Sequence, residues 1–327
     1  MPPRVAAIRP SRAIEGGRIV IEGVDFPLDS QRLPEVHIGA LAARLAHASS
    51  STLSVIVPSG LDAGSTPIRV EGAVGETPFV NIAAPFATGL HQVDNPVFDR
   101  DGNLYVTYSG TRGQQVPVSI FKVRPNGARE TFSSGIVNAT SIAIDDSGRL
   151  YVSSRFEGTV YRVARDGSFE PFATDLGIAC GLAFARNGDL FVGDRSGTIF
   201  RVDSSGKAEA FAAVPSSVAA FHLAIAPDGY IWVTAPTLST YDPIYKVAPD
   251  GNVSTVDVRF GRPQGIAFSP NGDAFVVEAL AGASGVYRLP PSGAPELVLA
   301  GPNLIGLAFD SFGSMVVCSN ETAFRLN

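Results

Sequence analysis

The sequence predicts an all-β protein in two parts, a small β-sandwich over residues 1–83 and a six-bladed β-propeller over residues 84–327. Three observations support this prediction. One sequence motif recurs six times at intervals of about 40 residues. The tetrapeptide PFAT occurs both inside the repeats and before the first of them, and the pattern of predicted strands differs before residue 84. Four strands in about 40 residues are typical of one propeller blade.

Each repeat begins with a predicted hairpin. An apolar run leads to a polar turn that ends in glycine, and a second run rich in β-branched and aromatic residues follows. This pattern indicates two antiparallel strands joined by a turn in which glycine adopts a positive φ. A third strand such as TVYRV and a fourth such as FEPFAT complete the period. The turn glycines are Gly102, Gly148, Gly188, Gly229, Gly272 and Gly313.

The last repeat lacks a fourth strand, because the chain stops after AFRLN. The segment PFATGL at 85–90 has the pattern of PFATDL at 171–176, which is a fourth strand of the second repeat. We therefore expect residues 85–90 to pair beside the C-terminal strand around Phe324. Such a closure hides two sheet edges that would otherwise present unpaired backbone groups.

Composition excludes several classes of partner. The chain has 25 Lys and Arg against 31 Asp and Glu, with no basic run, which argues against nucleic acid. It has no apolar stretch long enough to cross a membrane and no secretory signal, so we expect a soluble, cytoplasmic protein, or an exported one if the native gene starts upstream. Its two cysteines, Cys180 and Cys318, come from opposite blades and are expected to be free thiols.

The first 83 residues contain alternating strands, RIVIEG, EVHIGA, LSVIVP and PIRVEG, separated by Gly, Pro and Ser clusters. This rhythm predicts a β-sandwich. The segment VAAIRPSRAIEGGRIVIEGVDF, followed by TLSVIVPSGLDAGSTPIRVEG, resembles the immunoglobulin-like IPT/TIG domain. With an acidic balance and no Arg or Lys cluster, the resemblance implies a spacer or docking module.

Candidate site residues follow from the propeller prediction. Inner strands start, and second strands end, at the same mouth of the ring, so side chains at those positions converge. The inner ring is predicted to contain Asp94, Thr140, Cys180, Phe221, Gln264 and Ile305. The second ring contains Tyr108, Ser154, Asp194, Ala235, Glu278 and Ser319, followed one step on by Arg155, Arg195 and Asn320. The ligand-binding candidates are Tyr108, Thr140, Ser154, Arg155, Cys180, Arg195, Gln264 and Asn320, and His91 is a further candidate near the rim.

Residues 85–327 resemble the six-bladed propellers grouped as NHL-repeat and gluconolactonase/regucalcin-like proteins. That resemblance implies a divalent cation (Ca, Mn or Zn) held at inner-ring positions, and Asp94 in DNPVFD stands at the place of the family's glutamate. Phe221 and Gln264 replace the family's asparagine and aspartate, and Phe offers a cation no lone pair. A different cage made from Asp94, Asp194 and Glu278 is the alternative metal site.

Other interpretations of these residues stay open. Asp194 and Glu278 could instead cap loops or pair with Arg155 and Arg195. His222 is a candidate base or a packed structural histidine, and a trio of Ser154, His222 and Asp194 can be assembled on paper. FVVE at 275–278 resembles the strand end of virginiamycin B lyases, but Leu280 occupies the place of their catalytic histidine.

Two functions therefore compete. In the first, the propeller mouth binds a small polar ligand and could hydrolyse a lactone or ester, with Asp94, His222 and Glu278 as catalytic residues and a cation on Asp94, Asp194 and Glu278. In the second, the protein is a non-catalytic scaffold that binds protein or glycan partners through the propeller face and the N-terminal domain. The sequence leaves open whether the protein is an enzyme.

Overall fold

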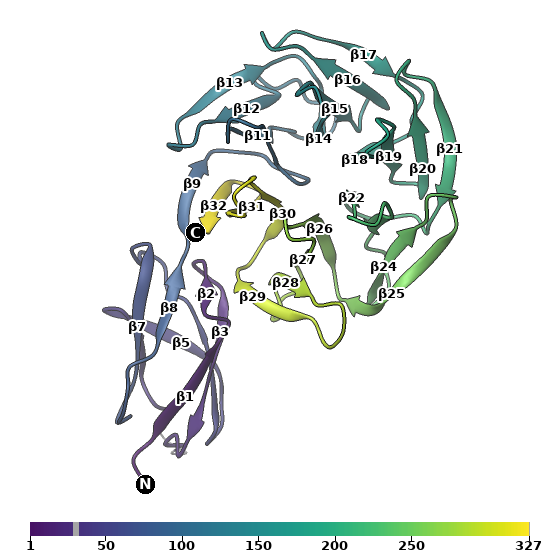
Figure 1. Cartoon of the computed structure of the whole chain (residues 1–327). Helices are drawn as coiled ribbons and strands as arrows, with labels where there is room; N and C mark the ends of the chain where they lie inside the picture. The colour runs from purple at the N-terminus through teal and green to yellow at the C-terminus, as the bar shows by residue number, and fades with distance from the viewer. Residues whose placement is uncertain (29–32, 327) are drawn as a thin grey trace. The chain divides into compact units, whose positions relative to one another are not determined.

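The computed structural model describes residues 1–28 and 33–326, and every regular element among them is a β-strand (Figure 1). No helix within these ranges is long and apolar enough to cross a membrane. The chain divides into two compact units. Unit 1 contains Met1–Ala84, Leu280–Arg288 and Pro295–Asn303, and unit 2 contains the rest of the described chain.

The ring contains five separate four-stranded antiparallel sheets, and in the first four the strands follow one another in sequence order from the inside of the ring outward (Figure 1). The first two are β10 (Val97–Phe98), β11 (Leu104–Thr107), β12 (Ile120–Val123) and β13 (Arg129–Ser133), and β14 (Ala139–Ile144), β15 (Leu150–Ser154), β16 (Thr159–Val163) and β17 (Phe169–Ala173). The next two are β18 (Ala179–Phe184), β19 (Leu190–Asp194), β20 (Thr198–Val202) and β21 (Ala208–Ala213), and β22 (His222–Ile225), β23 (Ile231–Thr234), β24 (Asp242–Val247) and β25 (Val253–Phe260). The last contains β30 (Leu304–Phe309), β31 (Met315–Ser319), β32 (Thr322–Leu326) and β9 (Ala84–Thr88).

The turn glycines have the conformation that the repeat predicts. All six have a positive φ, between 78° and 89°, which a residue with a Cβ adopts only with strain. In each repeat the glycine N–H donates to the carbonyl three residues earlier, as Gly188 does to Ala185 at 3.0 Å. The hairpins predicted from the sequence are therefore confirmed as local structures.

The ring-closing strand is also where the sequence places it. β9 lies beside β32, and the ladder continues past its end, because Leu90 N donates to Glu321 O and Gln92 N donates to Asn320 O. The guanidinium of Arg325 lies 5.1 Å from the centre of the Phe86 ring. A segment from before the first repeat therefore completes the sheet of the last one.

The prediction of six separate blades is wrong. The repeat that begins near Gln264 forms β26 (Pro263–Phe268), β27 (Ala274–Glu278), β28 (Gly285–Leu289) and β29 (Glu296–Ala300), but these strands end a twelve-stranded sheet in the order β1-β3-β6-β5-β4-β7-β8-β2-β29-β28-β27-β26. β2 (Arg12–Ala13) pairs in parallel with β29, opposite Ala300. Without β2, the outer edge of β29 would present unpaired backbone N–H and C=O groups, and β2 pairs with this edge. The periodicity shows a repeat but not what joins its outer edge.

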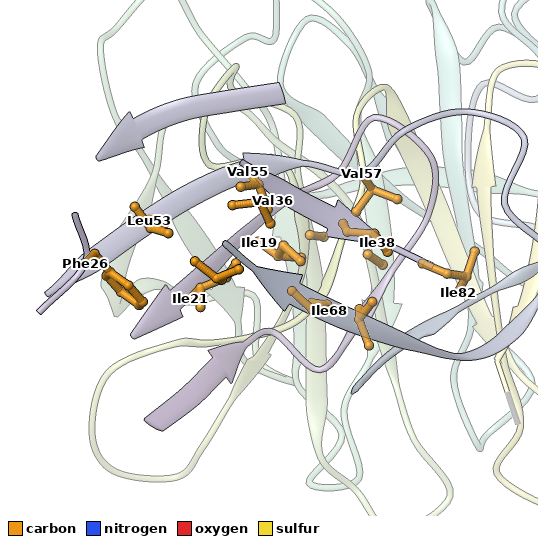
Figure 2. Close-up of a cluster of buried hydrophobic side chains, with 14 residues drawn as sticks. Ile19, Ile21, Phe26, Val36, Ile38, Leu53, Val55, Val57, Ile68 and Ile82 are labelled. Atoms are coloured by element: carbon orange, nitrogen blue, oxygen red, sulfur yellow. The ribbon is translucent and has the colours of Figure 1, made fainter. Parts of the chain in front are cut away.

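The prediction of a separate immunoglobulin-like IPT/TIG domain is also wrong. The predicted strands exist as β3 (Arg18–Val24), β4 (Val36–Ile38), β6 (Thr52–Ile56) and β7 (Gly64–Val70). They form one unit with β28 and β29, together with β1 (Arg4–Arg9), β2, β5 (Leu41–Ala48) and β8 (Phe79–Ile82). Figure 2 shows the core of this unit, in which Ile19, Ile21 and Leu53 are fully buried. Ala300 belongs to the same core, so the N-terminal strands do not close a core of their own.

Candidate functional site

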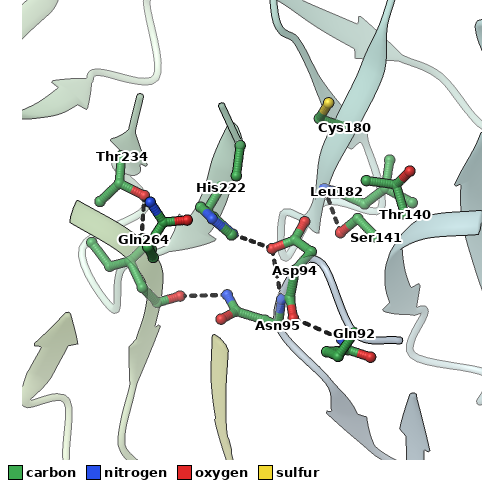
Figure 3. Close-up of polar contacts among 12 residues, drawn as sticks. Gln92, Asp94, Asn95, Thr140, Ser141, Cys180, Leu182, His222, Thr234 and Gln264 are labelled. Carbon is green, nitrogen blue, oxygen red and sulfur yellow. Dashed lines mark hydrogen bonds and ion pairs between the residues drawn. The ribbon is translucent and has the colours of Figure 1, made fainter. Parts of the chain in front are cut away.

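Asp94 and His222 meet inside unit 2, although 128 residues separate them in the sequence. Asp94 precedes the first inner strand β10, and His222 begins the fourth inner strand β22. The imidazole Nδ1 donates to Asp94 Oδ1, as Figure 3 shows, and the two side chains are 0% and 4% exposed. Two of the predicted catalytic residues are thus brought into direct contact.

Two amides fix the position of Asp94, and sequence reasoning missed both. Asn95 N donates to Asp94 Oδ1 at 2.7 Å, and the Asn95 side chain links Ile266 O and Leu307 N at 2.9 and 3.0 Å. On the other side, Gln92 Nε2 donates to Asp94 O at 2.6 Å. The signal that could have identified them is that both are amide residues within two positions of a candidate acid at the start of an inner strand.

The second nitrogen of the His222 ring is buried and has no hydrogen-bond partner among the described residues. A neutral imidazole whose Nδ1 donates to a carboxylate carries its free lone pair on Nε2. A buried nitrogen without a partner costs free energy unless a water or ligand satisfies it. His222 therefore has the orientation of a general base, with Asp94 setting its tautomer.

Asp194 and Glu278 cap loops, which is the alternative to a role as cation ligands that the sequence left open. Glu278 accepts from Gly261 N and Arg262 N at 2.6 and 2.8 Å, while Asp194 Oδ1 accepts from Ile178 N at 2.8 Å and Ser196 N at 3.2 Å. Both carboxylates thus hold the loop that precedes the inner strand of their own repeat.

The residues predicted to be cation ligands do not form a cation-binding site. Across residues 1–28 and 33–326, no group of three or more His, Cys, Asp or Glu residues is arranged to hold a metal ion. The cage predicted from Asp94, Asp194 and Glu278 is not formed, because two of its carboxylates are bonded to loop backbone. Phe221, at the position of a family ligand, is a core residue packed against Gly193.

Ser154 occupies the position equivalent to Asp194 and also holds its loop, donating from Oγ to Val137 O at 2.6 Å. Thr140 donates to Asn138 O, and Asn320 Nδ2 donates to Gln92 O at 3.1 Å. The Gln264 side chain is buried, and Figure 3 places it near His222 and Thr234. These predicted ligand-binding residues lie near the inner strands, but three of them use their polar groups to hold backbone.

Arg155 and Arg195 are different, because neither guanidinium has an ion pair or hydrogen bond within the described residues. Both are half-buried. Arginines on the third strands of the repeats have partners instead: Arg162 pairs with Glu170, and Arg201 with Glu209. The pKa of Arg155 is lowered by burial and, among neighbouring charges, by those of Arg195 and Arg112. The structure therefore brings two guanidinium groups close enough to affect each other's charge, and neither forms an ion pair with an acid of the described chain.

His91 lies next to this positive charge. Its ring centre is 5.6 Å from that of Tyr108, and the two residues form an isolated parallel bridge. Burial and the charge of Arg155 lower the pKa of His91, which keeps the imidazole neutral. His91 and Tyr108 thus form an uncharged, partly aromatic border to the arginines.

Cys180 and Cys318 are free thiols, as predicted, and both are buried. Burial and the Asp94 charge raise the pKa of Cys180 to about 12. A thiol with so high a pKa is not a nucleophile at neutral pH. Cys180 is therefore a packing residue of the inner ring and gives no catalytic site.

No protein-family model matches the sequence, and no curated protein matches it. The fold is similar to that of an auxiliary nutrient binding protein from Bacteroides thetaiotaomicron, with a TM-score of 0.58 and 14% identity, over 100% of this chain and 98% of that one. It is also similar to virginiamycin B lyase from Staphylococcus aureus, with a TM-score of 0.54, 14% identity and coverage of 70% and 78%. A protein proposed to be a gluconolactonase has a TM-score of 0.60, 17% identity and coverage of 74% and 90%. At these identities the similarity establishes a shared β-propeller fold.

Proposed function

We propose that the protein binds a small polar ligand with an anionic group, through the guanidinium groups of Arg155 and Arg195. The observation that carries this proposal is that both side chains are half-buried and without an acidic partner in the described chain. A guanidinium presents its N–H groups in a planar fork that matches a carboxylate or phosphate. Partial removal from water strengthens such a contact.

The proteins of similar fold support binding as the general role. Two of them, from Bacteroides thetaiotaomicron and Bacteroides ovatus, are auxiliary nutrient binding proteins. In each case the structural alignment with this protein covers 98% of the other chain. A small-molecule ligand in this chain agrees with that role. The ligand's anionic character rests on the arginines alone.

The test measures the binding of small anions by titration calorimetry. A panel of acetate, gluconate and inorganic phosphate is titrated into the wild type, Arg155→Gln, Arg195→Gln and a control, Arg201→Gln. The control removes the same charge from an exposed third strand where the arginine already pairs with Glu209. A hydrogen bond to a charged group contributes about 1.5–3 kcal/mol. We therefore expect Arg155→Gln and Arg195→Gln each to weaken binding about 10- to 100-fold, and Arg201→Gln to leave it unchanged.

Equal affinities for the wild type and the two site variants would refute the proposal. So would the absence of binding for every anion of the panel.

A second candidate function is hydrolysis of a lactone or ester, favoured by the free Nε2 of His222. In this function His222 removes a proton from water as the water attacks the carbonyl, and Asp94 stabilises the imidazolium that forms. This mechanism needs no cation bound to Asp194 or Glu278, because both carboxylates accept hydrogen bonds from loop backbone. A screen of lactones and aryl esters with the wild type and His222→Gln tests this candidate. Hydrolysis that survives the substitution would contradict it, and a protein without hydrolysis would remain a binding protein.

A further inference from the structure

Exposed apolar side chains lie on loops of the same kind as those that carry Arg155 and Arg195. These loops join the second strand of a repeat to the third, or the fourth strand to the next inner strand; we call their side of unit 2 the mouth face. Four large apolar residues on this face are exposed: Phe156 at 53%, Val218 at 44%, Leu238 at 91% and Tyr241 at 56%. Together with the arginines, they form a face that is both apolar and cationic.

Phe156 is held in place although half of it is exposed. Its ring packs over Gly113, where a Cβ atom would lie 3.1 Å from the ring. Gly113 N donates to Asn138 Oδ1 at 2.6 Å, and Asn138 Nδ2 donates to Ser109 O at 2.6 Å. Asn138 is fully buried, so a buried amide organises the loop that supports Phe156. The ring therefore forms a fixed surface beside Arg155.

Backbone hydrogen bonds connect the remaining members of the mouth face. Ser217 N donates to Arg195 O at 2.9 Å, and Val218 N donates to Pro236 O at 2.9 Å. The loop with Arg195 is thus joined to the segment with Val218, and that segment to the loop with Leu238. The charge of Arg195 and these apolar side chains belong to one continuous set of loops.

The acids of the mouth face in these repeats do not neutralise the arginines. None of them forms an ion pair with Arg155 or Arg195 within the described residues. Three are bonded within their own part of the face: Glu157 accepts from Tyr161 at 3.0 Å, Asp242 accepts from Thr237 N at 3.0 Å, and Asp194 holds Ile178. Since no carboxylate forms an ion pair with either guanidinium, their N–H groups are left to bind an anionic group of a ligand.

We propose that the ligand of this face is a small amphipathic acid, with its anionic group on Arg155 and Arg195 and an aliphatic or aromatic body against Phe156. This inference rests on the proposed function and adds to it the chemistry of the ligand's uncharged part. An acid with a polar body would leave Phe156 and Leu238 in contact with water. An apolar body removes that surface from water and gains affinity with each group that it buries.

The test compares a chain-length series of acids. Acetate, butyrate, hexanoate, octanoate and 3-phenylpropionate are titrated calorimetrically into the wild type, Phe156→Ala, Arg155→Gln and a control, Phe312→Ala. Phe312 is 93% exposed and lies in the hairpin turn before Gly313, away from the mouth-face loops. For the wild type we expect affinity to rise up to about fourfold per added methylene group, the value for full burial. Phe156→Ala should flatten this rise and leave acetate binding unchanged, while Phe312→Ala should leave both unchanged.

The outcomes separate the two proposals. If acetate binds through Arg155 but affinity does not rise with chain length, the amphipathic ligand is refuted and the anion site stands. If no acid of the series binds, or if Arg155→Gln binds all of them as the wild type does, both proposals are refuted. Sedimentation with phosphatidylglycerol vesicles adds a third arm, because binding to vesicles without binding to free acids would show that the face meets a lipid surface instead.

Discussion

Replacing Asp94 by alanine is expected to destabilise unit 2 strongly. The carboxylate is 4% exposed and receives hydrogen bonds from His222 Nδ1 and Asn95 N. Its removal leaves a fully buried imidazole with neither nitrogen bonded, because Nε2 has no partner already. Leaving a buried donor without its acceptor costs about 1–3 kcal/mol, and Asp94→Ala does this to two donors, which together gives about 3–5 kcal/mol. We expect Asp94→Ala to lower the free energy of unfolding by that amount.

Asp94→Asn is the informative companion to this variant. The asparagine amide oxygen can still accept from His222 Nδ1, so only the charge of the acceptor is lost. We expect a cost of about 1–2 kcal/mol, that of a weakened hydrogen bond. Asp101→Ala serves as the control, since Asp101 is exposed and lies in the hairpin turn of the same repeat. Its effect should stay within about 0.5 kcal/mol.

Urea denaturation followed by tryptophan fluorescence measures these differences. Trp232 is the single tryptophan of the chain, and it pairs with Ala224 in the hairpin that begins at His222. With an m-value of about 3 kcal/mol/M, a loss of 3–5 kcal/mol moves the midpoint down by about 1–1.7 M. If Asp94→Ala unfolds within 0.2 M of the wild type, the contact with His222 does not stabilise the fold and our reasoning is wrong. A large loss in Asp94→Asn, equal to that of the alanine variant, would show that charge matters more than the hydrogen bond.

Three further predictions concern single positions. Arg155→Gln should raise the pKa of His91, because the charge of Arg155 is, after burial, a cause of its lowering; an NMR titration of the imidazole measures this, and an unchanged value would contradict it. Since the folded His91 has the lower pKa, its unfolded form binds more protons, so stability is lost as pH falls below about 6.5, and the variant should lose less. Gly206→Ala should destabilise more than Gly188→Ala in urea, because both have φ near 88° but only at Gly206 would a Cβ lie 2.0 Å from a backbone carbonyl oxygen; equal losses, of about 1–2 kcal/mol for φ alone, would show that the neighbouring strand gives way. Cys180 should react with a thiol reagent only after denaturation, since its pKa is raised to about 12 and it is buried, and rapid labelling of the native protein would refute this.

Local features of this protein were predictable because they depend on neighbours in the sequence. The turn glycine of each hairpin was predicted to have a positive φ, and the glycine at 188 has one of 89°. The closing strand was predicted from the repetition of PFAT, and β9 lies beside β32. Asp94 was named as a candidate because inner-strand starts converge in a ring, and His222 was named as a candidate base next to the inner-ring position of Phe221. Each of these predictions uses a pattern that repeats along the chain.

The roles of individual side chains were not predictable in the same way. From their ring positions, Asp194 and Glu278 were predicted either to hold a cation or to cap loops, and the sequence did not decide between the two. In the structure both carboxylates bind loop N–H groups. Arg155 and Arg195 were predicted as ligand-binding residues, but that neither guanidinium forms an ion pair with an acid of the described chain is visible only in the coordinates. The contact of Asp94 with His222 depends on the curvature of the whole ring.

By itself the sequence determined the strands, their turns and the recurrence of a four-stranded unit, because these follow from alternating side chains, β-branched residues and glycines within a few residues of one another. Tertiary structure alone decided which strand edges pair. A sheet edge takes whichever backbone reaches it, so β2 extends the sheet at Ala300 and replaces the separate sandwich and the sixth separate blade that periodicity predicted. Edge pairing uses backbone groups that every residue carries, so the pattern of side chains in the sequence does not predict which edges pair.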